Sequence, residues 1–364
     1  MVVQSPNIQT DETGQATMQA AVLHGIRDLR LESLPVPVPG PGEVLLRIAS
    51  VGVCGSDVHY YVDGRIGDAV VTDPIIMGHE FSAVVAELGP GVSGLEVGRL
   101  VAVEPAIPCG RCEMCETGHP NLCPHVRFCG TPPIDGVYCE YAVMPAPNCF
   151  PMPNGFGAVD GAMLEPLGVA IHSVDLSHIR AGQTVAVLGA GPIGLLIAAV
   201  ARAAGAAQIL MTEPLDYRRA FALDYVADEV FDPRNEDVVS AVLDATNGRG
   251  VDIAFEAAGA LETPEQGAEM LRPGGTLVLC GIPGPEDRLV LTASVVRRKG
   301  LTIKLVRRMK HTYPRAFRLV QSGMVDVRAL ATHLIPLSRI AEAFEMVANY
   351  RDGVIRAVIQ VNEV

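Results

Sequence analysis

The sequence predicts an α/β protein of two domains: a β-rich, barrel-like lobe and a doubly wound parallel sheet. Three observations lead to this class. The chain has 364 residues, more than one typical hydrophobic core holds. Between Met18 and Phe150, short apolar β-type runs alternate with Gly and Pro turn signals at a spacing of about ten residues. After Leu167 the pattern changes to alternating strands and helices, which favours a parallel sheet.

Composition and charge narrow the class of protein. The chain is 49% hydrophobic, which indicates a well-buried globular protein. Its formal net charge of −13 argues against nucleic acid as a partner, because phosphate binding needs clustered Lys and Arg. Residues 1–17 lack the basic start and apolar stretch of a signal peptide, so we expect a disordered lead and a cytoplasmic protein. Nine cysteines in that compartment suggest metal binding before disulfides.

The most specific motif lies between Thr184 and Glu213, where a β-type run meets GAGPIG and an apolar helical stretch follows. Three glycines at these positions allow a tight turn, close approach of the backbone to a pyrophosphate, and close packing of helix on strand. The pyrophosphate then binds at the helix N-terminus, where free N–H groups favour an anion. The motif residues are Gly189, Gly191, Pro192, Ile193 and Gly194. With an acid at the end of the second strand, this is a dinucleotide-binding signature.

The acid that ends this motif, Glu213, favours NAD over NADP. A carboxylate there binds the adenosine ribose hydroxyls and repels a 2′-phosphate. Arg218, which we place with the cofactor-binding residues, and Arg219 follow it, and receipt of a 2′-phosphate by this pair stays an alternative. The stretch Ala181 to Val200 has no charged residue and the length of a transmembrane helix, but glycines and a proline interrupt it, so we expect no membrane partner.

Four cysteines with the spacing C-x2-C-x2-C-x7-C lie in a loop rich in Gly and Pro. Thiolates this close in sequence can surround one tetrahedral zinc ion in a closed, structural site. A redox-active pair is one alternative, although four thiols exceed what a dithiol switch requires. A [4Fe–4S] cluster, which also takes four cysteines, is another. We predict structural zinc on Cys109, Cys112, Cys115 and Cys123.

A second set of metal-ligand residue types is dispersed along the chain: Cys54, the pair His79-Glu80, and Glu165. Each alone has an ordinary interpretation, since a single buried cysteine is often a small hydrophobic residue. Together they offer sulfur, nitrogen and carboxylate ligands, with room for a water or substrate oxygen. That combination is what an open, catalytic zinc site requires.

Taken in order, GHE, the four-cysteine loop, GAGPIG and the terminal acid resemble the zinc-dependent medium-chain dehydrogenase/reductase superfamily, from Met18 onward. CGSDVHYY, RFCGTPPIDG and LEPLGVAIH are similar to its polyol dehydrogenase branch, the sorbitol, xylitol and L-iditol 2-dehydrogenases. The resemblance implies a GroES-like β-barrel catalytic domain with an inserted Rossmann domain. The domains expected are a disordered lead at 1–17, the catalytic domain with its zinc lobe at 18–167, the NAD-binding Rossmann domain at 168–305, and the C-terminal completion of the catalytic domain at 306–364.

The resemblance also implies a reaction and its residues. A secondary alcohol of a polyol, bound to zinc, is oxidised to a ketose with NAD as the hydride acceptor, and Glu165 binds the metal directly or through a water. Ser56 accepts the released proton and passes it toward His59, for which an ordinary half-buried histidine is the plainer interpretation. Asp57 orients the ligand His79 through the second ring nitrogen. The catalytic residues are then Ser56, His59 and Glu165.

By the same resemblance, Tyr60, Phe128 and Arg307 line the substrate pocket. The chain departs from the branch at Val306-Arg307-Arg308, where an aromatic-Arg-Tyr triplet is usual. An anionic substrate group would explain Arg308, and solvent exposure is the alternative. L-Threonine 3-dehydrogenase or another zinc alcohol dehydrogenase is the nearest other function, and a non-catalytic binding or structural relative a remote one. We expect a homodimer or homotetramer, in which the apolar strand around Leu277–Ile282 pairs across a two-fold axis.

Overall fold

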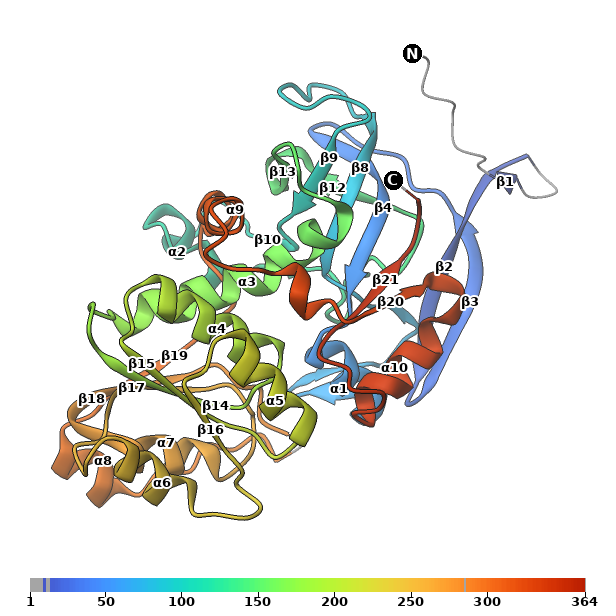
Figure 1. Cartoon of the computed structure of the whole chain (residues 1–364). Helices are drawn as coiled ribbons and strands as arrows, with labels where there is room; N and C mark the ends of the chain where they lie inside the picture. Colours follow the sequence, from blue (N-terminus) through green and yellow to red (C-terminus); the bar gives the residue numbers. More distant parts are fainter. Residues whose placement is uncertain (1–8, 11–13, 285, 364) are drawn as a thin grey trace. The chain divides into compact units, whose positions relative to one another are not determined.

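The computed structural model describes residues 9–10, 14–284 and 286–363, called the described residues below (Figure 1). The chain divides into two compact units. The first holds the chain up to Glu165 and again from Arg328, and the second holds Pro166–Val327. The first division lies close to the expected boundary after residue 167, and the second lies well beyond the one expected after residue 305. Most of the expected N-terminal lead lies outside the described residues, but Gln9–Thr10 forms β1, which pairs with β2.

The first unit is built on two main sheets. The larger has the order β13-β9-β8-β4-β21-β20, with β12 also paired to β4, and the smaller holds β1, β2, β3 and β7. Strand β21 from the C-terminal end pairs antiparallel with β4, so the two separate parts of the sequence share one sheet. Val44, Leu46 and Ile48 of β4 are fully buried in the core. Removing side chains of this size from water contributes about 1.5–3 kcal/mol each.

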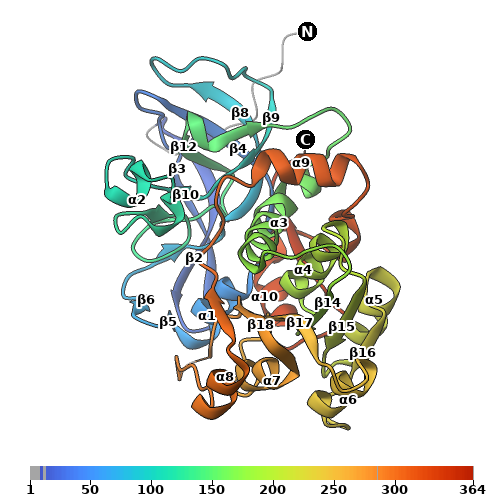
Figure 2. The ribbon, with the colours of Figure 1, turned by 90° about the vertical axis from the view of Figure 1, so that its left-hand side faces the viewer.

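The elements of the first unit are β1 (Gln9–Thr10), β2 (Ala16–Gly25), β3 (Asp28–Pro35), β4 (Glu43–Gly52), α1 (Gly55–Asp63), β5 (Arg65–Ile66), β6 (Ala69–Val70), β7 (Ile75–Ile76), β8 (Glu80–Leu88), β9 (Leu100–Val103), β10 (Ala106–Ile107), α2 (Glu113–Glu116), β11 (Arg127–Phe128), β12 (Tyr141–Pro145), β13 (Cys149–Pro151), β20 (His333–Pro336), α10 (Ile340–Ala348) and β21 (Ala357–Gln360). Helix α3 (Ala158–Ser177) begins in this unit and continues into the second. Figure 2 shows α2 beside β10, at the margin of the first unit.

Helix α1 is fixed at both ends and along one side. It begins after Cys54, where the Asp57 side chain accepts a hydrogen bond from the Cys54 backbone N–H at 3.1 Å. It ends at Gly64, whose φ of 70° is in the left-handed region that favours glycine. The Tyr61 hydroxyl donates to Glu345 of α10 at 2.9 Å, and its ring lies 5.1 Å from that of Phe344. Helix α1 is therefore a rigid carrier for the side chains described below.

The second unit contains a six-stranded sheet of order β16-β15-β14-β17-β18-β19 in which neighbouring strands are parallel. The prediction of a doubly wound parallel sheet is confirmed. Its elements are β14 (Thr184–Leu188), α4 (Pro192–Ala203), β15 (Gln208–Thr212), α5 (Asp216–Tyr225), β16 (Glu229–Phe231), α6 (Val238–Ala245), β17 (Val251–Glu256), α7 (Thr263–Met270), β18 (Leu271–Leu279), α8 (Ala293–Lys299), β19 (Thr302–Leu305) and α9 (Tyr313–Gln321).

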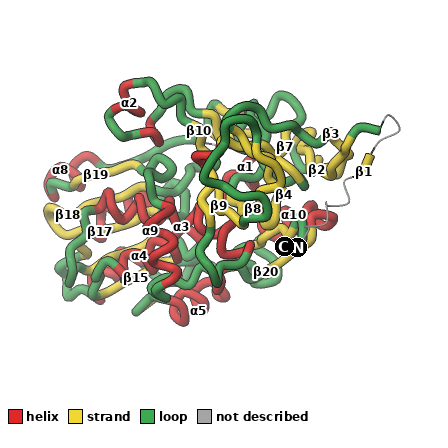
Figure 3. Tube along the Cα trace, turned by 90° about the horizontal axis from the view of Figure 1, so that it is seen from above, coloured by secondary structure: helices red, strands yellow, loops and turns green. Residues whose placement is uncertain are grey.

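Helices cover both faces of this sheet. Helices α6, α7 and α8 pack on one face, where Val242, Ala268 and Met270 join Leu210 and Leu277 in one apolar cluster. Figure 1 shows α4 and α5 on the opposite face, and Figure 3 shows α8 beside β18 and β19 at one end of the sheet. The central strands β14, β15 and β17 are almost entirely buried, as expected for a parallel sheet covered on both faces, whereas the edge strands β16 and β19 are partly exposed.

Two expectations about apolar segments are settled by the topology. The stretch Ala181–Val200 is divided between β14 and α4, and none of the described helices is both long and apolar enough to span a membrane. The expected pairing of Leu277–Ile282 across a two-fold axis is wrong, because β18 already has β17 on one side and β19 on the other. An edge strand is needed for such pairing, and on this side of the sheet the edge is β19.

Candidate metal centres and cofactor site

The four cysteines of the loop come together in the first unit. The sulfur atoms of Cys109, Cys112, Cys115 and Cys123 all lie within 4.8 Å of one another. The sulfur atoms of Cys112 and Cys115 are 3.5 Å apart and do not form a disulfide. Hydrogen bonds, the strongest from the Arg111 backbone, lower the pKa of Cys109 to about 6, which favours the thiolate form that metals bind. Four sulfur donors around one point are the ligand set of a closed zinc site.

The dispersed ligands are brought together by the pairing of β4 with β8. Gly52 at the end of β4 lies opposite Glu80 at the start of β8, so Cys54, two residues on, faces His79 and Glu80. One donor atom from each of these three residues lies within 4.8 Å of the others. An added Cβ at Gly52 would lie 2.4 Å from Glu80 Oε2, so only glycine leaves room for this carboxylate. The register of β4 with β8 therefore brings together ligands that are far apart in the sequence.

Asp57 lies behind two of these three ligands. Its carboxylate is fully buried and accepts hydrogen bonds from the backbone N–H groups of Cys54 at 3.1 Å and Gly78 at 3.2 Å. Oδ1 lies 3.5 Å from His79 Nδ1. Burial alone would raise the pKa of Asp57, but His79 and these hydrogen bonds outweigh it and lower that pKa. Asp57 is thus an anion that binds the backbone at Cys54 and at Gly78 and lies beside the His79 ring nitrogen, while its expected role in orienting His79 stays a prediction.

Tyr138 is a member of this site that carries no local signal in the sequence. Its side chain is fully buried, and its hydroxyl lies 2.9 Å from Asp57 Oδ2 and 3.0 Å from the Gly52 carbonyl oxygen. Burial, and then the Asp57 charge, raise the pKa of Tyr138 well above its usual range, so the hydroxyl keeps its proton and donates. Its ring lies against Gly78, where an added Cβ would be 2.9 Å away. Tyr138 therefore links the residues flanking Cys54 and His79.

Arg356 is the second member that the sequence does not reveal. It is 4% exposed and forms an ion pair with Oε2 of Glu80, which is 1% exposed. Its Nη1 donates to the Val53 carbonyl oxygen at 2.9 Å. The other Glu80 oxygen, Oε1, is buried and has no hydrogen-bond partner among the described residues. Arg356 thus engages one oxygen of Glu80 and leaves the other available.

These residues fit a zinc ion. A buried carboxylate oxygen without a partner is costly, and it lies beside a thiol and an imidazole, the donors that zinc prefers. Burial, and then the charge of Glu80, raise the pKa of Cys54, so in the absence of a cation the thiol is favoured over the thiolate. A bound divalent cation reverses this balance and deprotonates a coordinating thiol. The set has three protein donors, as catalytic zinc sites do.

Glu165 lies in α3 and is buried near this set. Among the described residues, the donor atoms within 4.8 Å of one another belong to Cys54, His79 and Glu80 and do not include Glu165. Burial, and then the charge of Glu80, raise the pKa of Glu165 to about 8. Its part in the chemistry stays a prediction.

The other predicted catalytic and substrate residues lie in different places. Ser56 and His59 are half-buried on α1, and His59 Nδ1 lies 3.1 Å from Asp63 Oδ2. Tyr60, also on α1, is buried, and the Phe128 ring lies 5.2 Å from that of His79. Arg307 is exposed and belongs to the second unit. A pocket shared by these residues stays a prediction.

The glycine-rich loop of the second unit has the form that a nucleotide requires. Gly189 has a φ of 99°, and an added Cβ at Gly194 would lie 1.9 Å from the Gly189 carbonyl oxygen. In contrast, an added Cβ at Gly191 would meet only Arg218 Nη1, at 3.7 Å, so the loop is open there. Pro192 begins α4 and Ile193 follows it, with Gly191 as the N-terminal cap. The loop therefore presents free N–H groups at a helix start.

Glu213 directly follows β15, next to this loop. The parallel register of β14 with β15 pairs Leu188 with Thr212, which brings Glu213 beside the glycines. Its Oε2 accepts a hydrogen bond from the Ala190 N–H at 2.9 Å, and its Oε1 accepts one from the Leu215 N–H at 3.1 Å. Each carboxylate oxygen has a further lone pair, so both can still accept from ribose hydroxyls.

Fold and ligand sets together define a zinc-binding medium-chain dehydrogenase. Two family models match the sequence: the alcohol dehydrogenase GroES-like domain over residues 40–154, and the zinc-binding dehydrogenase domain over residues 192–322. The chain belongs to this family of oxidoreductases, which act on CH–OH groups, and to its polyol and alcohol dehydrogenases. The expected GroES-like and Rossmann combination is confirmed.

Known relatives extend over nearly the whole chain. Sorbitol dehydrogenase of Bacillus subtilis (strain 168) is 36% identical over 345 residues, covering 95% of this chain and 98% of the relative. The protein named "Probable D-xylulose reductase A" of Aspergillus clavatus is 41% identical over 335 residues, covering 90% and 92%. An Escherichia coli oxidoreductase of unknown specificity superposes with a TM-score of 0.90 at 30% identity, covering 95% and 100%. A zinc-binding dehydrogenase of Sinorhizobium meliloti 1021, solved bound to NADP, gives 0.87 at 31%, covering 95% and 100%.

Proposed function

We propose that the chain oxidises a secondary hydroxyl group of a polyol, such as xylitol or sorbitol, to the ketose, with NAD as the hydride acceptor. The observation that carries this proposal is the buried set of Cys54, His79 and Glu80, in which Glu80 Oε1 still lacks a partner. Relatives named as sorbitol dehydrogenase and D-xylulose reductase support the substrate class. Glu213 beside the glycine loop supports NAD, although one structural relative binds NADP.

The ligands and their supporting residues fix where the reaction takes place. Cys54, His79 and Glu80 would hold a zinc ion, which when bound would supply Lewis-acid polarisation of the substrate hydroxyl, and bound NAD would supply the hydride acceptor. Asp57 keeps the His79 ring oriented through Nδ1, and Arg356 keeps Glu80 from turning away. We assign to Glu165, whose pKa is raised by burial and by the charge of Glu80, the binding of a water or a substrate hydroxyl at the edge of this set, whether or not it binds zinc itself.

The alcohol loses a proton as well as a hydride, so the site needs a path for that proton. We assign the first step to the Ser56 hydroxyl and the next to His59, on the same side of α1. His59 Nδ1 lies 3.1 Å from Asp63 Oδ2, and this contact orients the imidazole ring. Both side chains are half-buried, so the proton can reach solvent from His59.

For the substrate we propose contacts from Tyr60, Phe128 and Arg307. Phe128 borders the metal ligands through its ring contact with His79, and Tyr60 is fixed on α1. Arg307 would donate to distal hydroxyl groups. Arg308, half-buried with a φ of 54°, keeps a carboxylate- or phosphate-bearing substrate open as the second candidate. We propose further that the active form is a cytoplasmic homodimer or homotetramer.

The test follows NADH formation from NAD with xylitol, sorbitol, L-threonine and ethanol, each with and without a zinc chelator. We expect chelator-sensitive turnover of xylitol or sorbitol, restored by added zinc. Activity on L-threonine alone would replace the polyol substrate with an amino acid. Polyol turnover that survives complete zinc removal would contradict the proposed role of Cys54, His79 and Glu80. Inactivity on all four would direct the search to anionic substrates and Arg308.

A further inference from the structure

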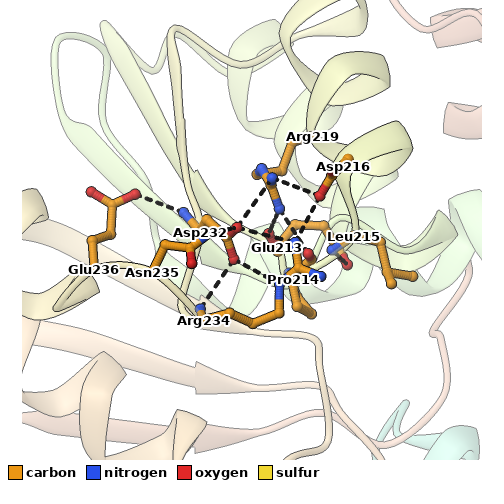
Figure 4. A network of polar contacts seen from close by, with 9 residues as sticks. All are labelled: Glu213, Pro214, Leu215, Asp216, Arg219, Asp232, Arg234, Asn235 and Glu236. Carbon is orange, nitrogen blue, oxygen red and sulfur yellow. Dashed lines mark hydrogen bonds and ion pairs between the residues drawn. The ribbon is translucent and has the colours of Figure 1, made fainter.

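A polar network surrounds the position that decides the cofactor, and it contains two arginines that a 2′-phosphate would be expected to attract. The network lies where β15 and β16 end, next to Glu213 (Figure 4). Its charged pairs are formed by Arg219 and Arg234 with Asp216 and Asp232. Our inference rests on the proposed use of NAD and concerns how the site discriminates against the 2′-phosphate of NADP.

The Arg219 guanidinium group contacts backbone carbonyl oxygens and carboxylates near Glu213. Its Nη1 donates to the carbonyl oxygens of Glu213 at 3.0 Å and Pro214 at 2.7 Å. Its Nη2 lies 2.9 Å from Asp216 Oδ1 and 3.1 Å from Asp232 Oδ2. A guanidinium group has five N–H donors, and the four on Nη1 and Nη2 face these four oxygens. Arg219 is thus fixed in place with its charge already matched.

Arg234 is engaged by the same two carboxylates. Its Nη2 donates to Asp216 Oδ1 at 2.7 Å and to Asp232 Oδ2 at 3.1 Å, and its Nε donates to Asp232 Oδ1 at 3.1 Å. Asn235 donates to Asp232 Oδ2 at 2.8 Å, which fixes that carboxylate further. Hydrogen bonds, first from the Arg234 side chain, lower the pKa of Asp232 to about 2, so it is ionised at neutral pH. The positive charges of Arg219 and Arg234 are therefore balanced by the negative charges of Asp216 and Asp232.

We propose that Asp216 and Asp232 determine the choice of NAD indirectly, by occupying the two arginines that would otherwise bind the 2′-phosphate of NADP. Dinucleotide-binding folds accept that phosphate through an arginine close to the acid at the end of the second strand. Here arginines stand at that place, but a phosphate would have to displace carboxylates already in charge-assisted hydrogen bonds. Glu213 recognises the ribose hydroxyls, while Asp216 and Asp232 keep Arg219 and Arg234 from binding a 2′-phosphate.

Arg218 has a different place from Arg219. Its Nη1 would lie 3.7 Å from an added Cβ at Gly191, so it faces the glycine loop where the pyrophosphate is expected. Its guanidinium carbon lies 5.9 Å from the centre of the Tyr217 ring. The ion pairs of Asp216 and Asp232 described above are formed with Arg219 and Arg234. We therefore assign Arg218 to the pyrophosphate, which NAD and NADP share, and Arg219 and Arg234 to the 2′-phosphate, which only NADP carries.

The test compares Asp216→Asn, Asp232→Asn and the double variant with the unchanged protein. Two quantities are measured: the ratio of kcat/KM for NADP to that for NAD, and the Kd values of NADPH and NADH by calorimetry. Asparagine keeps the shape and removes the charge. We expect the double variant to raise the ratio about tenfold or more, the gain of one hydrogen bond between charged groups, and to tighten NADPH binding selectively. An unchanged ratio and unchanged NADPH affinity would overturn the proposal.

Asp175→Asn is the matched control. It changes the net charge of the same unit by one, but Asp175 pairs with Arg315, 2.6 Å away, outside the network. It should leave the kcat/KM ratio and the two Kd values unchanged. If the double variant does not fold, Asp216→Asn decides alone, because the Asp216 side chain is 82% exposed and still contacts both arginines. A preference for NADP in the unchanged protein would refute the proposed function, whereas an NAD preference insensitive to these variants would refute only this inference.

Discussion

The two groups of metal ligands in the first unit are built in opposite ways. Cys109, Cys112, Cys115 and Cys123 come from one loop, which contains only the four-residue helix α2 and other short elements, and three of the four are half-buried. The set of Cys54, His79 and Glu80 is instead assembled by strand pairing. Two buried charged residues, Asp57 and Arg356, contact these ligands. Metal therefore holds the first site together, whereas the fold holds the second.

This difference has an energetic consequence. In the loop, four thiols have little else to bind, so zinc supplies most of the stability of the lobe. At the other site, Asp57, Tyr138 and Arg356 satisfy one another and their neighbours through hydrogen bonds and ion pairs that need no metal. Removing zinc should therefore loosen the lobe but leave the catalytic ligands in place.

The largest effect should come from Arg356→Met. This change leaves the buried Glu80 carboxylate without its partner, which we expect to lower the free energy of unfolding of the zinc-free protein by about 3–5 kcal/mol. Urea denaturation measures it. Arg356→Lys, which keeps a positive charge, should lose distinctly less. A loss below about 1 kcal/mol for Arg356→Met would show that Glu80 needs no partner, and that the fold does not hold this site.

A smaller loss should follow from Tyr138→Phe. Removing the hydroxyl deprives the buried Asp57 carboxylate of one hydrogen bond, for which we expect about 1.5–3 kcal/mol. The same variant should weaken zinc binding at Cys54 and His79 about tenfold or more, measured by competition with a chelator, because supporting residues orient the ligands. Tyr141→Phe removes a hydroxyl elsewhere in the same unit and serves as the control. If both variants changed stability and zinc affinity equally, Tyr138 would have no specific role in the metal site.

The smallest effect on the zinc-free protein should come from Cys109→Ser. With metal absent, we expect its free energy of unfolding to change by no more than about 0.5 kcal/mol, as for other changes away from the core. With metal present, the zinc content should fall from two ions per chain to one, and the lobe should become sensitive to protease. Metal analysis and limited proteolysis measure these changes. A large loss of stability without metal would mean that the lobe is held by the fold after all.

The parts of the molecule that the sequence predicts well are those with local causes. The strand, glycine loop and helix from Thr184 to Ala203 follow from glycine geometry and apolar runs within about twenty residues. The four-cysteine cluster follows from spacing alone. In both regions, neighbours in the sequence are neighbours in space, so a motif is enough.

What the sequence could not predict depends on contacts between distant segments. The partner of Glu80 is Arg356, 276 residues away, and the partner of Asp57 is Tyr138, 81 residues away, and neither has a motif. The cofactor network is similar, because Asp232 approaches Arg219 only when β15 and β16 pair. The expected two-fold pairing of Leu277–Ile282 failed for a related reason. An apolar run indicates a buried strand, but its place inside or at the edge of a sheet is set by topology.

We assign the catalytic zinc site to Cys54, His79 and Glu80, and not to the four-cysteine lobe. The most direct test compares Cys54→Ser with Cys109→Ser for zinc content and for NADH formation with xylitol and sorbitol. We predict that each variant loses one zinc ion, that Cys54→Ser is folded but without turnover, and that Cys109→Ser keeps measurable turnover. Polyol turnover by Cys54→Ser at the rate of the unchanged protein would contradict the claim.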